Sequence, residues 1–238
     1  MIRMRDYTKG IRKPPSAAHL CRLVGPTAEA TAKRIIEFQD ANIKIQTWRA
    51  VDFLTAYLAG GNYDHLLRQA KLAKKKNKHL GNAALETLPL VKQYKRDFGL
   101  DWFRSVNPIS VKLSQNLDVH LKPMGLTAID DQLTLVAGQV WKDTSLNPFS
   151  FRLWRSILKL GYLDNQFDVK GFHWLELSAP KRGHEREFAL RTNETVEAFS
   201  DEEMNSIVKN IDQAMDIVRT VPPKKRQRKP DPKQGDFF

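Results

Sequence analysis

A long hydrophobic run is absent from this sequence of 238 residues. No stretch of eighteen apolar residues occurs, so we expect no membrane-spanning helix. Residues 1–20 carry basic side chains but lack the apolar segment of a secretory signal. The only cysteine is Cys21, which excludes an intrachain disulfide and is typical of proteins in a reducing compartment. These absences predict a cytoplasmic protein.

Signatures of catalysis and metal binding are also scarce. The sequence has no glycine-rich phosphate loop, no nucleophile elbow and no zinc signature. Its histidines form no metal-binding spacing with one another or with the cysteine. They are His19, His65, His79, His120, His173 and His184. We therefore predict no metal and no cofactor, and we assign the histidines structural or surface roles.

Positive charge is abundant. The 39 Lys and Arg outnumber the 27 Asp and Glu, which gives a net charge of +12 and a pI near 9.8. Residues 222–238 account for +4 of this charge, and the rest of the chain carries +8. Because the excess extends to the folded part, it favours a polyanionic partner, most often nucleic acid.

Residues 1–106 have mainly helical periodicity, and we interpret them as a helical section. The expected helices cover residues 15–23, 26–41, 46–58, 63–78 and 82–98. Gly60-Gly61 ends the third of these helices and Gly99 the last. Pro89 lies inside the last helix, where a proline is expected to kink or split it.

Residues 107–221 have the pattern of a sheet with helices. Strands are expected at 109–113, 117–121, 125–129, 133–140, 172–177 and 185–191. Asp130-Asp131 has the composition of a tight turn. Alternation places Leu135 and Ala137 on one face of their strand and Val136 and Val140 on the other. Asn147-Pro148 opens a further helix.

The last helix has the clearest start signal, a capping box formed by Ser200 and Glu203. Pro222-Pro223 ends this helix, and the basic, proline-rich residues 222–238 predict a disordered tail. The predicted fold class is α+β, with an N-terminal helical section, a central mixed or antiparallel sheet with a crossover helix, and a C-terminal helix. Residues 1–106 and 107–221 are compatible with one domain.

From residue 82 the expected order is a helix, three strands, a helix and a further strand. Three meandering strands, a crossover helix and a fourth strand resemble the core of the PD-(D/E)XK nuclease superfamily, over roughly residues 82–178. The resemblance implies an acidic residue on the second strand, and an acidic residue and a lysine two positions apart on the third. In that superfamily these groups bind Mg²⁺ and position the water that attacks a phosphodiester.

The sequence departs from that pattern at the positions where the superfamily has its acidic residues. Met124 stands where the first acid belongs, and the third strand has Gln139 and Trp141 on one face and Lys142 on the other. The carboxylates left as candidate migrated ligands are Asp118, Asp130, Asp131 and Glu176. We therefore expect a degenerate, non-cleaving member. The alternative is an Mg²⁺-dependent nuclease in which Asp118, Asp130 or Asp131 acts with Lys142.

Two basic stripes are candidates for nucleic-acid binding. The first lies on helix 63–78, where Arg68, Lys71 and Lys75 share one face. The second lies on the helix after Pro148 and consists of Arg152, Arg155 and Lys159. A solvated helix face is the alternative interpretation of the first stripe. On the second helix we place Trp154 in the core, since it belongs to the opposite, apolar face.

Residues 222–238 contain two further candidate sites. Gln234-Gly235-Asp236-Phe237-Phe238 resembles the short peptide by which bacterial replication and repair proteins dock on the DNA sliding clamp. The resemblance implies that Gln234 bonds in a polar subsite and that Phe237 and Phe238 fill an apolar pocket, with Asp236, which precedes them, also among the docking residues. The family usually has Leu or Met where Phe237 stands. The residues expected to contact DNA or an acidic rim are Lys224, Lys225, Arg226, Arg228 and Lys229.

The favoured prediction is a non-enzymatic, DNA-associated accessory protein that docks on the sliding clamp in replication or repair. It would be nucleoid-associated in the cytoplasm. Besides the nuclease, one alternative is a protein-interaction factor whose basic run, residues 223–229, resembles a nuclear import signal. That factor would be nuclear in a eukaryote or in a eukaryotic host.

Overall fold

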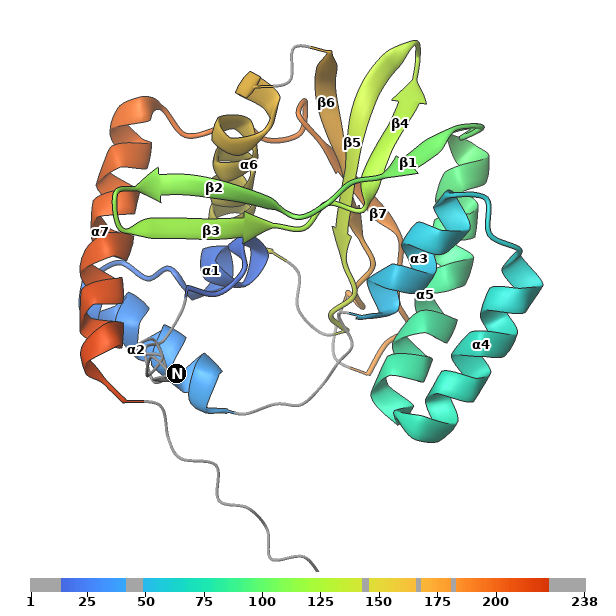
Figure 1. Cartoon of the computed structure of the whole chain (residues 1–238), viewed down its shortest axis with the longest axis horizontal. Coiled ribbons are helices and arrows are strands. Elements are labelled where there is room, and N and C mark those ends of the chain that lie inside the picture. The colour runs from blue at the N-terminus through green and yellow to red at the C-terminus, as the bar shows by residue number, and fades with distance from the viewer. Residues whose placement is uncertain (1–13, 42–48, 143–145, 166–167, 181–182, 223–238) are drawn as a thin grey trace, which may run out of the picture.

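A computed structural model describes residues 14–41, 49–142, 146–165, 168–180 and 183–222 (Figure 1). It confirms the α+β fold class, with helices first, a mixed sheet with a crossover helix, and a C-terminal helix. The predicted tail and its docking peptide lie outside the described residues. In the described parts of the chain, no helix has the length and apolar composition needed to cross a membrane.

The central sheet has five strands in the order β1-β4-β5-β6-β7. Their bounds are Phe103–Ser105, Gly125–Ile129, Gln132–Gln139, Val169–Glu176 and Ala189–Thr192. Only β5 and β6 pair in parallel, and α6 (Pro148–Gly161) connects them as a crossover helix. The other pairs are antiparallel.

A second sheet was not predicted. Strands β2 (Ile109–Ser114) and β3 (Leu117–Leu121) pair only with each other in the described structure, so β4 lies beside β1 and not beside β3. The expected meander of consecutive strands is therefore interrupted by a separate hairpin. Strand β1 precedes the expected boundary at residue 106 but pairs with β4, which follows it.

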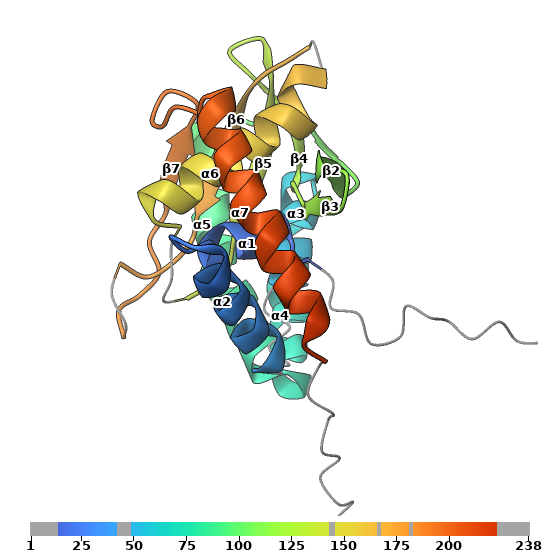
Figure 2. The same cartoon turned by 90° about the vertical axis from the view of Figure 1, so that its left-hand side faces the viewer.

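Helices cover both faces of the central sheet (Figures 1 and 2). On one face α6 packs against β6 and shares a core with α1 (Ala17–Leu23), α2 (Ala28–Asp40) and α7 (Asp201–Thr220), of which α2 and α7 contact each other. The other packs against α3 (Ala50–Leu58), α4 (Tyr63–Lys76) and α5 (Lys78–Asp97). The alternation predicted for β5 is confirmed, because Leu135 and Ala137 lie in the first core and Val136 and Val140 in the second.

Some element boundaries differ from the expectation. Asn77 ends α4 and caps α5 with its side chain, so α5 begins four residues before the expected Asn82. Pro89 lies inside α5, which is continuous from residue 78 to residue 97. The strand expected at 185–191 is β7, which begins only at Ala189. Arg186, which precedes it, is turned inward and bonds to Trp141 and Leu177.

Candidate nucleic-acid interface

Helix α4 presents the first predicted stripe to solvent. Arg68, Lys71 and Lys75 are all exposed, and the intervening Ala70 is fully buried against α5. Asn62 caps the start of the helix, and its Oδ1 accepts a hydrogen bond from the backbone N–H of His65 at 2.9 Å. Lys74, Lys75 and Lys76 occupy its last turn, where positive charge is stabilised by the helix dipole. The local sequence thus fixes both the helix and its basic face.

Close packing against α5 holds α4 in place. A Cβ atom built on Gly81 would lie 2.3 Å from the Cα of Lys74, a separation that real Cβ atoms do not adopt. The two helices are separated by one residue, Asn77, whose Oδ1 accepts a hydrogen bond from the N–H of Leu80 at 3.1 Å. The basic face is therefore carried on a compact helical hairpin.

The cations of α4 are not neutralised within the described structure. Among the described residues, no ion pair joins Arg68, Lys71, Lys74, Lys75 or Lys76 to a carboxylate. Residues 49–98, which include α3, α4 and α5, contain ten Lys or Arg against four Asp or Glu, a net charge of +6. Residues 99–221 carry a net charge of −3. Within the described residues, positive charge is thus concentrated on this helical region.

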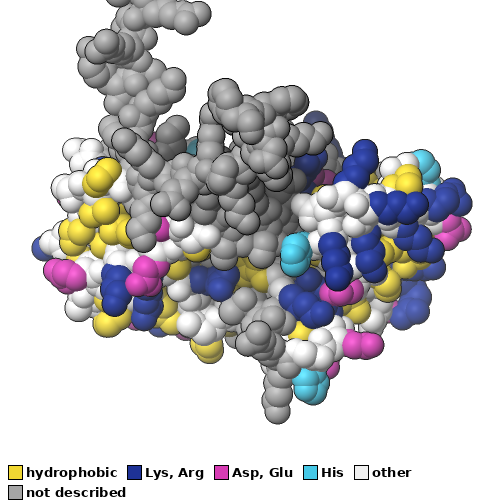
Figure 3. Space-filling model, turned by 90° about the horizontal axis from the view of Figure 1, so that it is seen from below, with side chains coloured by type: hydrophobic (Ala, Val, Ile, Leu, Met, Phe, Trp, Pro, Cys, Tyr) yellow, Lys and Arg dark blue, Asp and Glu magenta, His cyan; other side chains and the backbone are white. Residues whose placement is uncertain are grey.

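Figure 3 shows the same segregation on the surface. Lys and Arg side chains gather at the right-hand side, which is the side that α3, α4 and α5 occupy in Figure 1. Acidic side chains are sparse among them. This face can attract a polyanion without first breaking an internal ion pair.

Two of the three residues in the second predicted stripe, Arg152 and Lys159, form ion pairs within the protein. Arg152 Nη2 lies 2.9 Å from Glu203 Oε2, and its guanidinium stacks over the ring of Phe199 at 4.1 Å. Lys159 Nζ lies 3.1 Å from Asp164 Oδ2. Burial lowers the pKa of Arg155, although the nearby Glu197 opposes this shift. Arg152 and Lys159 would have to give up these partners to bind phosphate, so α6 is the weaker candidate surface.

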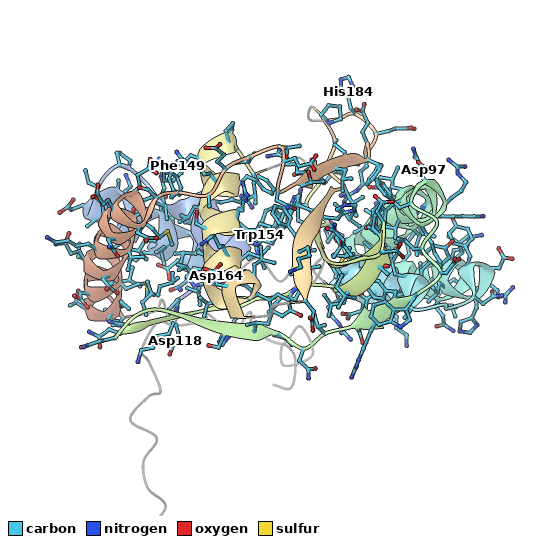
Figure 4. All side chains as sticks on the ribbon, turned by 90° about the horizontal axis from the view of Figure 1, so that it is seen from above. Asp97, Asp118, Phe149, Trp154, Asp164 and His184 are labelled. Atoms are coloured by element: carbon cyan, nitrogen blue, oxygen red, sulfur yellow. The ribbon has the colours of Figure 1, made fainter. Side chains whose placement is uncertain are left out.

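Trp154 belongs to the core, as the sequence predicted. It is 3% exposed, and its ring centroid lies 4.4 Å from that of Trp174 on β6. Figure 4 shows it on α6, within the molecule, with Asp118 on the separate β2–β3 ribbon. Trp154 is therefore not a platform on which bases can stack.

The carboxylates considered for a nuclease site do not gather around Lys142. Asp130 and Asp131 form the turn before β5 and adopt φ values of 49° and 59°. Lys142 follows the far end of this strand, so its eight residues separate the groups by about 25 Å. Asp118 lies opposite Lys112 in the two-stranded sheet. Within the residues that the structure describes, no group of three or more His, Cys, Asp or Glu side chains could hold a metal ion.

Glu176 alone of the four candidate acids lies at the carboxyl end of β5 and β6. It is 6% exposed and sits opposite Gln139, whose Nε2 donates a hydrogen bond to its Oε1. Gln139 Oε1 in turn accepts a bond from the backbone N–H of Trp141 at 2.7 Å. The neutral amide and the buried carboxylate thus satisfy each other in part, and they help to order the end of β5.

A second polar cluster at the same end was not foreseen. Arg186, with only 4% of its side chain exposed, donates to Glu86 Oε2 at 2.8 Å and to the carbonyl oxygens of Trp141 and Leu177. Glu86 Oε1 also lies 3.8 Å from Lys142 Nζ. No local sequence pattern predicts this cluster, because 100 residues separate Glu86 from Arg186. It anchors the segment before β7 to α5.

Aromatic contacts cover the end of β5 on its other face. The ring of His19 lies 4.8 Å from those of both Phe38 and Trp141, and Arg22 stacks over Trp141 at 4.4 Å. Burial, together with the charges of Arg22 and Lys122, lowers the pKa of His19 to about 4. The structural role predicted for the histidines fits this one.

Comparison with known proteins identifies no family for the chain. No family model matches the sequence, and no curated protein matches it.

Proposed function

We propose that the protein is a non-enzymatic, DNA-associated accessory protein of replication or repair that docks on the sliding clamp. The observation that carries the proposal is the exposed row of cations on α4, which have no ion-pair partner among the described residues. An arrangement of this kind favours phosphate groups, because binding releases counterions from the nucleic acid without sacrificing an internal contact.

The clamp contact is supported by the sequence of residues 234–238. Gln234 has the donors and acceptor that a polar subsite requires, and Phe237 and Phe238 supply two rings for an apolar pocket. Burying such a ring contributes about 1.5–3 kcal/mol. Ordering a short segment offsets part of that energy, so the peptide alone is a weak anchor.

Two weak contacts reinforce each other when they reach one assembly. A protein bound to DNA through α4 holds its clamp-binding residues at a high effective concentration near a clamp on the same DNA. The basic residues Lys224, Lys225, Arg226, Arg228 and Lys229 would add phosphate contacts between the two sites. This combination is expected of a protein recruited to loaded clamps.

The test of clamp docking is a pulldown of purified clamp by the full chain. We expect wild type to retain the clamp and Phe237→Ala/Phe238→Ala to lose it by at least about 10-fold, since each ring contributes more than 1.4 kcal/mol. Pro230→Ala/Pro232→Ala changes the same segment outside the motif and is the control. Equal recovery of the clamp by wild type and the double Phe variant would eliminate this contact.

A further inference from the structure

We propose that α4 binds the sugar–phosphate backbone of duplex DNA, with Arg68, Lys71 and Lys75 on neighbouring phosphates of one strand. This inference rests on the proposed function, because it assumes that the polyanion is nucleic acid. It goes further by specifying a double-stranded partner, recognised without regard to sequence, and by naming the helix that makes the contact.

The spacing of the three cations supports contact with a regular backbone. Steps of three and four residues keep them within a stripe about 60° wide and advance them by about 4.5 and 6 Å along the helix axis. Phosphates of one strand advance by about 3.4 Å per nucleotide along a duplex. Long, exposed Lys and Arg side chains can reach phosphates on either side of their own positions, so a helix laid against the duplex backbone can bring each cation to a phosphate.

The rigidity of the hairpin favours a partner that is itself regular. Ala70 is fully buried on the inner side of α4, and the close approach of Gly81 to Lys74 leaves the helix no room to shift toward α5. The Cα atoms of the three cationic residues are therefore held at constant spacing. A duplex presents phosphates at constant spacing too, whereas a single strand would have to be ordered on binding.

The composition of the exposed face argues against single strands. Proteins that bind single strands stack bases on aromatic side chains. Among the described residues, the exposed side chains of α4 include no Phe, Tyr or Trp. Tyr63, in the first turn, is half-buried, and Lys92 lies over its ring at 4.4 Å. Lys and Arg predominate among the exposed side chains of α4, which favours electrostatic contact with the sugar–phosphate backbone over base stacking.

The same face offers few groups that read bases. Bidentate recognition of a base edge uses Asn, Gln or Arg directed into a groove, and we assign Arg68 of the stripe to a phosphate instead. The one exposed amide on α4, Gln69, lies about 100° around the helix from Arg68, so it leaves the cationic stripe. We therefore expect the affinity to depend on salt and hardly at all on sequence.

The test is fluorescence anisotropy with the full chain and labelled oligonucleotides of about 20 nucleotides, as a mixed-sequence duplex and as oligo-dT. We compare wild type with Arg68→Ala/Lys71→Ala/Lys75→Ala. The matched control is Lys33→Ala/Lys112→Ala/Lys209→Ala, which removes the same charge from exposed positions on α2, β2 and α7. Circular dichroism checks that both variants fold, as expected since alanine favours helix at the α4 positions.

We expect wild type to prefer the duplex, and the α4 variant to bind it at least about 10-fold more weakly, with the slope of log K against log salt reduced by about 3. The control should retain most of the wild-type affinity. Equal loss in the control would overturn the assignment to α4. Equal or tighter binding of oligo-dT would contradict the proposed preference for duplex DNA. It would still support nucleic acid as the partner. If wild type bound neither oligonucleotide, the proposed function would fail as well.

Discussion

His19 shows at the scale of single residues how burial decides the role of a titratable group. Its ring lies between those of Phe38 and Trp141, and burial is the largest cause of its lowered pKa of about 4. His173 lies on the opposite face of the sheet, where its Nδ1 is 3.1 Å from the hydroxyl of Tyr94. Burial lowers its pKa to about 4 as well, although the charge of Asp130 opposes the shift.

These two histidines predict a loss of stability in acid. Each binds a proton more readily in the unfolded chain, where its pKa is about 6.5, than in the folded protein. Their contribution is therefore present above pH 6.5 and lost as the pH falls from about 6.5 to about 4. We expect the free energy of unfolding to decrease by a few kcal/mol, on the order of 3, across this window.

Urea unfolding at a series of pH values measures this decrease. His19→Asn/His173→Asn should flatten the dependence between pH 6.5 and pH 4. His184→Asn is the control and should retain the wild-type slope, because this residue is exposed. An unchanged slope in the double variant would show that other groups cause the acid sensitivity.

Arg186 illustrates a different outcome for a polar residue. Its guanidinium is almost fully buried, yet it donates to a carboxylate and to two backbone carbonyl oxygens. A buried charge that is paired in this way is engaged in holding the fold. The cations of α4 differ because no ion pair engages them within the described structure.

At the scale of elements, the α4–α5 hairpin depends on the absence of a side chain at residue 81. Alanine would be favoured over glycine inside a helix by about 1 kcal/mol. The added Cβ would, however, lie 2.3 Å from the backbone of Lys74, so α4 would have to move. Overpacking of this kind typically costs about 1–3 kcal/mol, which outweighs the gain in propensity.

We therefore expect Gly81→Ala to lower the thermal unfolding midpoint by several degrees, since about 1 kcal/mol corresponds to about 2–4 °C in a protein of this size. Circular dichroism at 222 nm follows the transition. The variant should also bind duplex DNA more weakly, because the cationic row moves with α4. A raised midpoint would mean that the two helices separate at little cost.

At the scale of the whole molecule, β5 separates the groups that a nuclease would need to bring together. Asp130 and Asp131 precede the strand and Lys142 follows it, and Asp118 belongs to another sheet. Glu176 does lie near the end of β5, but its Oε1 is occupied by Gln139. Among the described residues, the carboxylates predicted for a nuclease site thus do not surround Lys142, whose Nζ lies 3.8 Å from Glu86 instead.

We expect purified protein with Mg²⁺ or Mn²⁺ to leave plasmid DNA intact. Gel electrophoresis of supercoiled plasmid detects a single nick per molecule and is a sensitive measurement. Lys142→Ala, prepared in the same way, controls for contaminating nucleases. Metal-dependent nicking by wild type that this substitution abolishes would contradict the non-enzymatic interpretation.

The distribution of charge is also a property of the whole chain. The helices of residues 49–98 carry a net charge of +6 on one face of the sheet, and residues 99–221 carry −3. In the view of Figure 3, Lys and Arg side chains gather on the side that α3, α4 and α5 occupy in Figure 1. A polyanion approaching the protein is therefore expected to be oriented toward α3, α4 and α5 before contact.

The sequence alone determined the features that depend on residues close to one another in the chain, within one helical turn or along one strand. The capping box at Ser200 and Glu203, the alternation along β5 and the basic stripe of α4 all follow from periods of 3.6 or 2 residues. The same reasoning placed Trp154 in the core. Local geometry imposes these periods wherever the segment lies in the fold.

The tertiary structure decided which distant residues meet. It paired β4 with β1, set β2 and β3 apart, and joined Glu86 to Arg186 and Arg152 to Glu203. The Arg152–Glu203 pair is one reason why α6 is a weaker candidate surface than α4. Such pairings depend on how the chain closes loops of 50 to 100 residues, as in Arg152–Glu203 and Glu86–Arg186, and no local period encodes that choice.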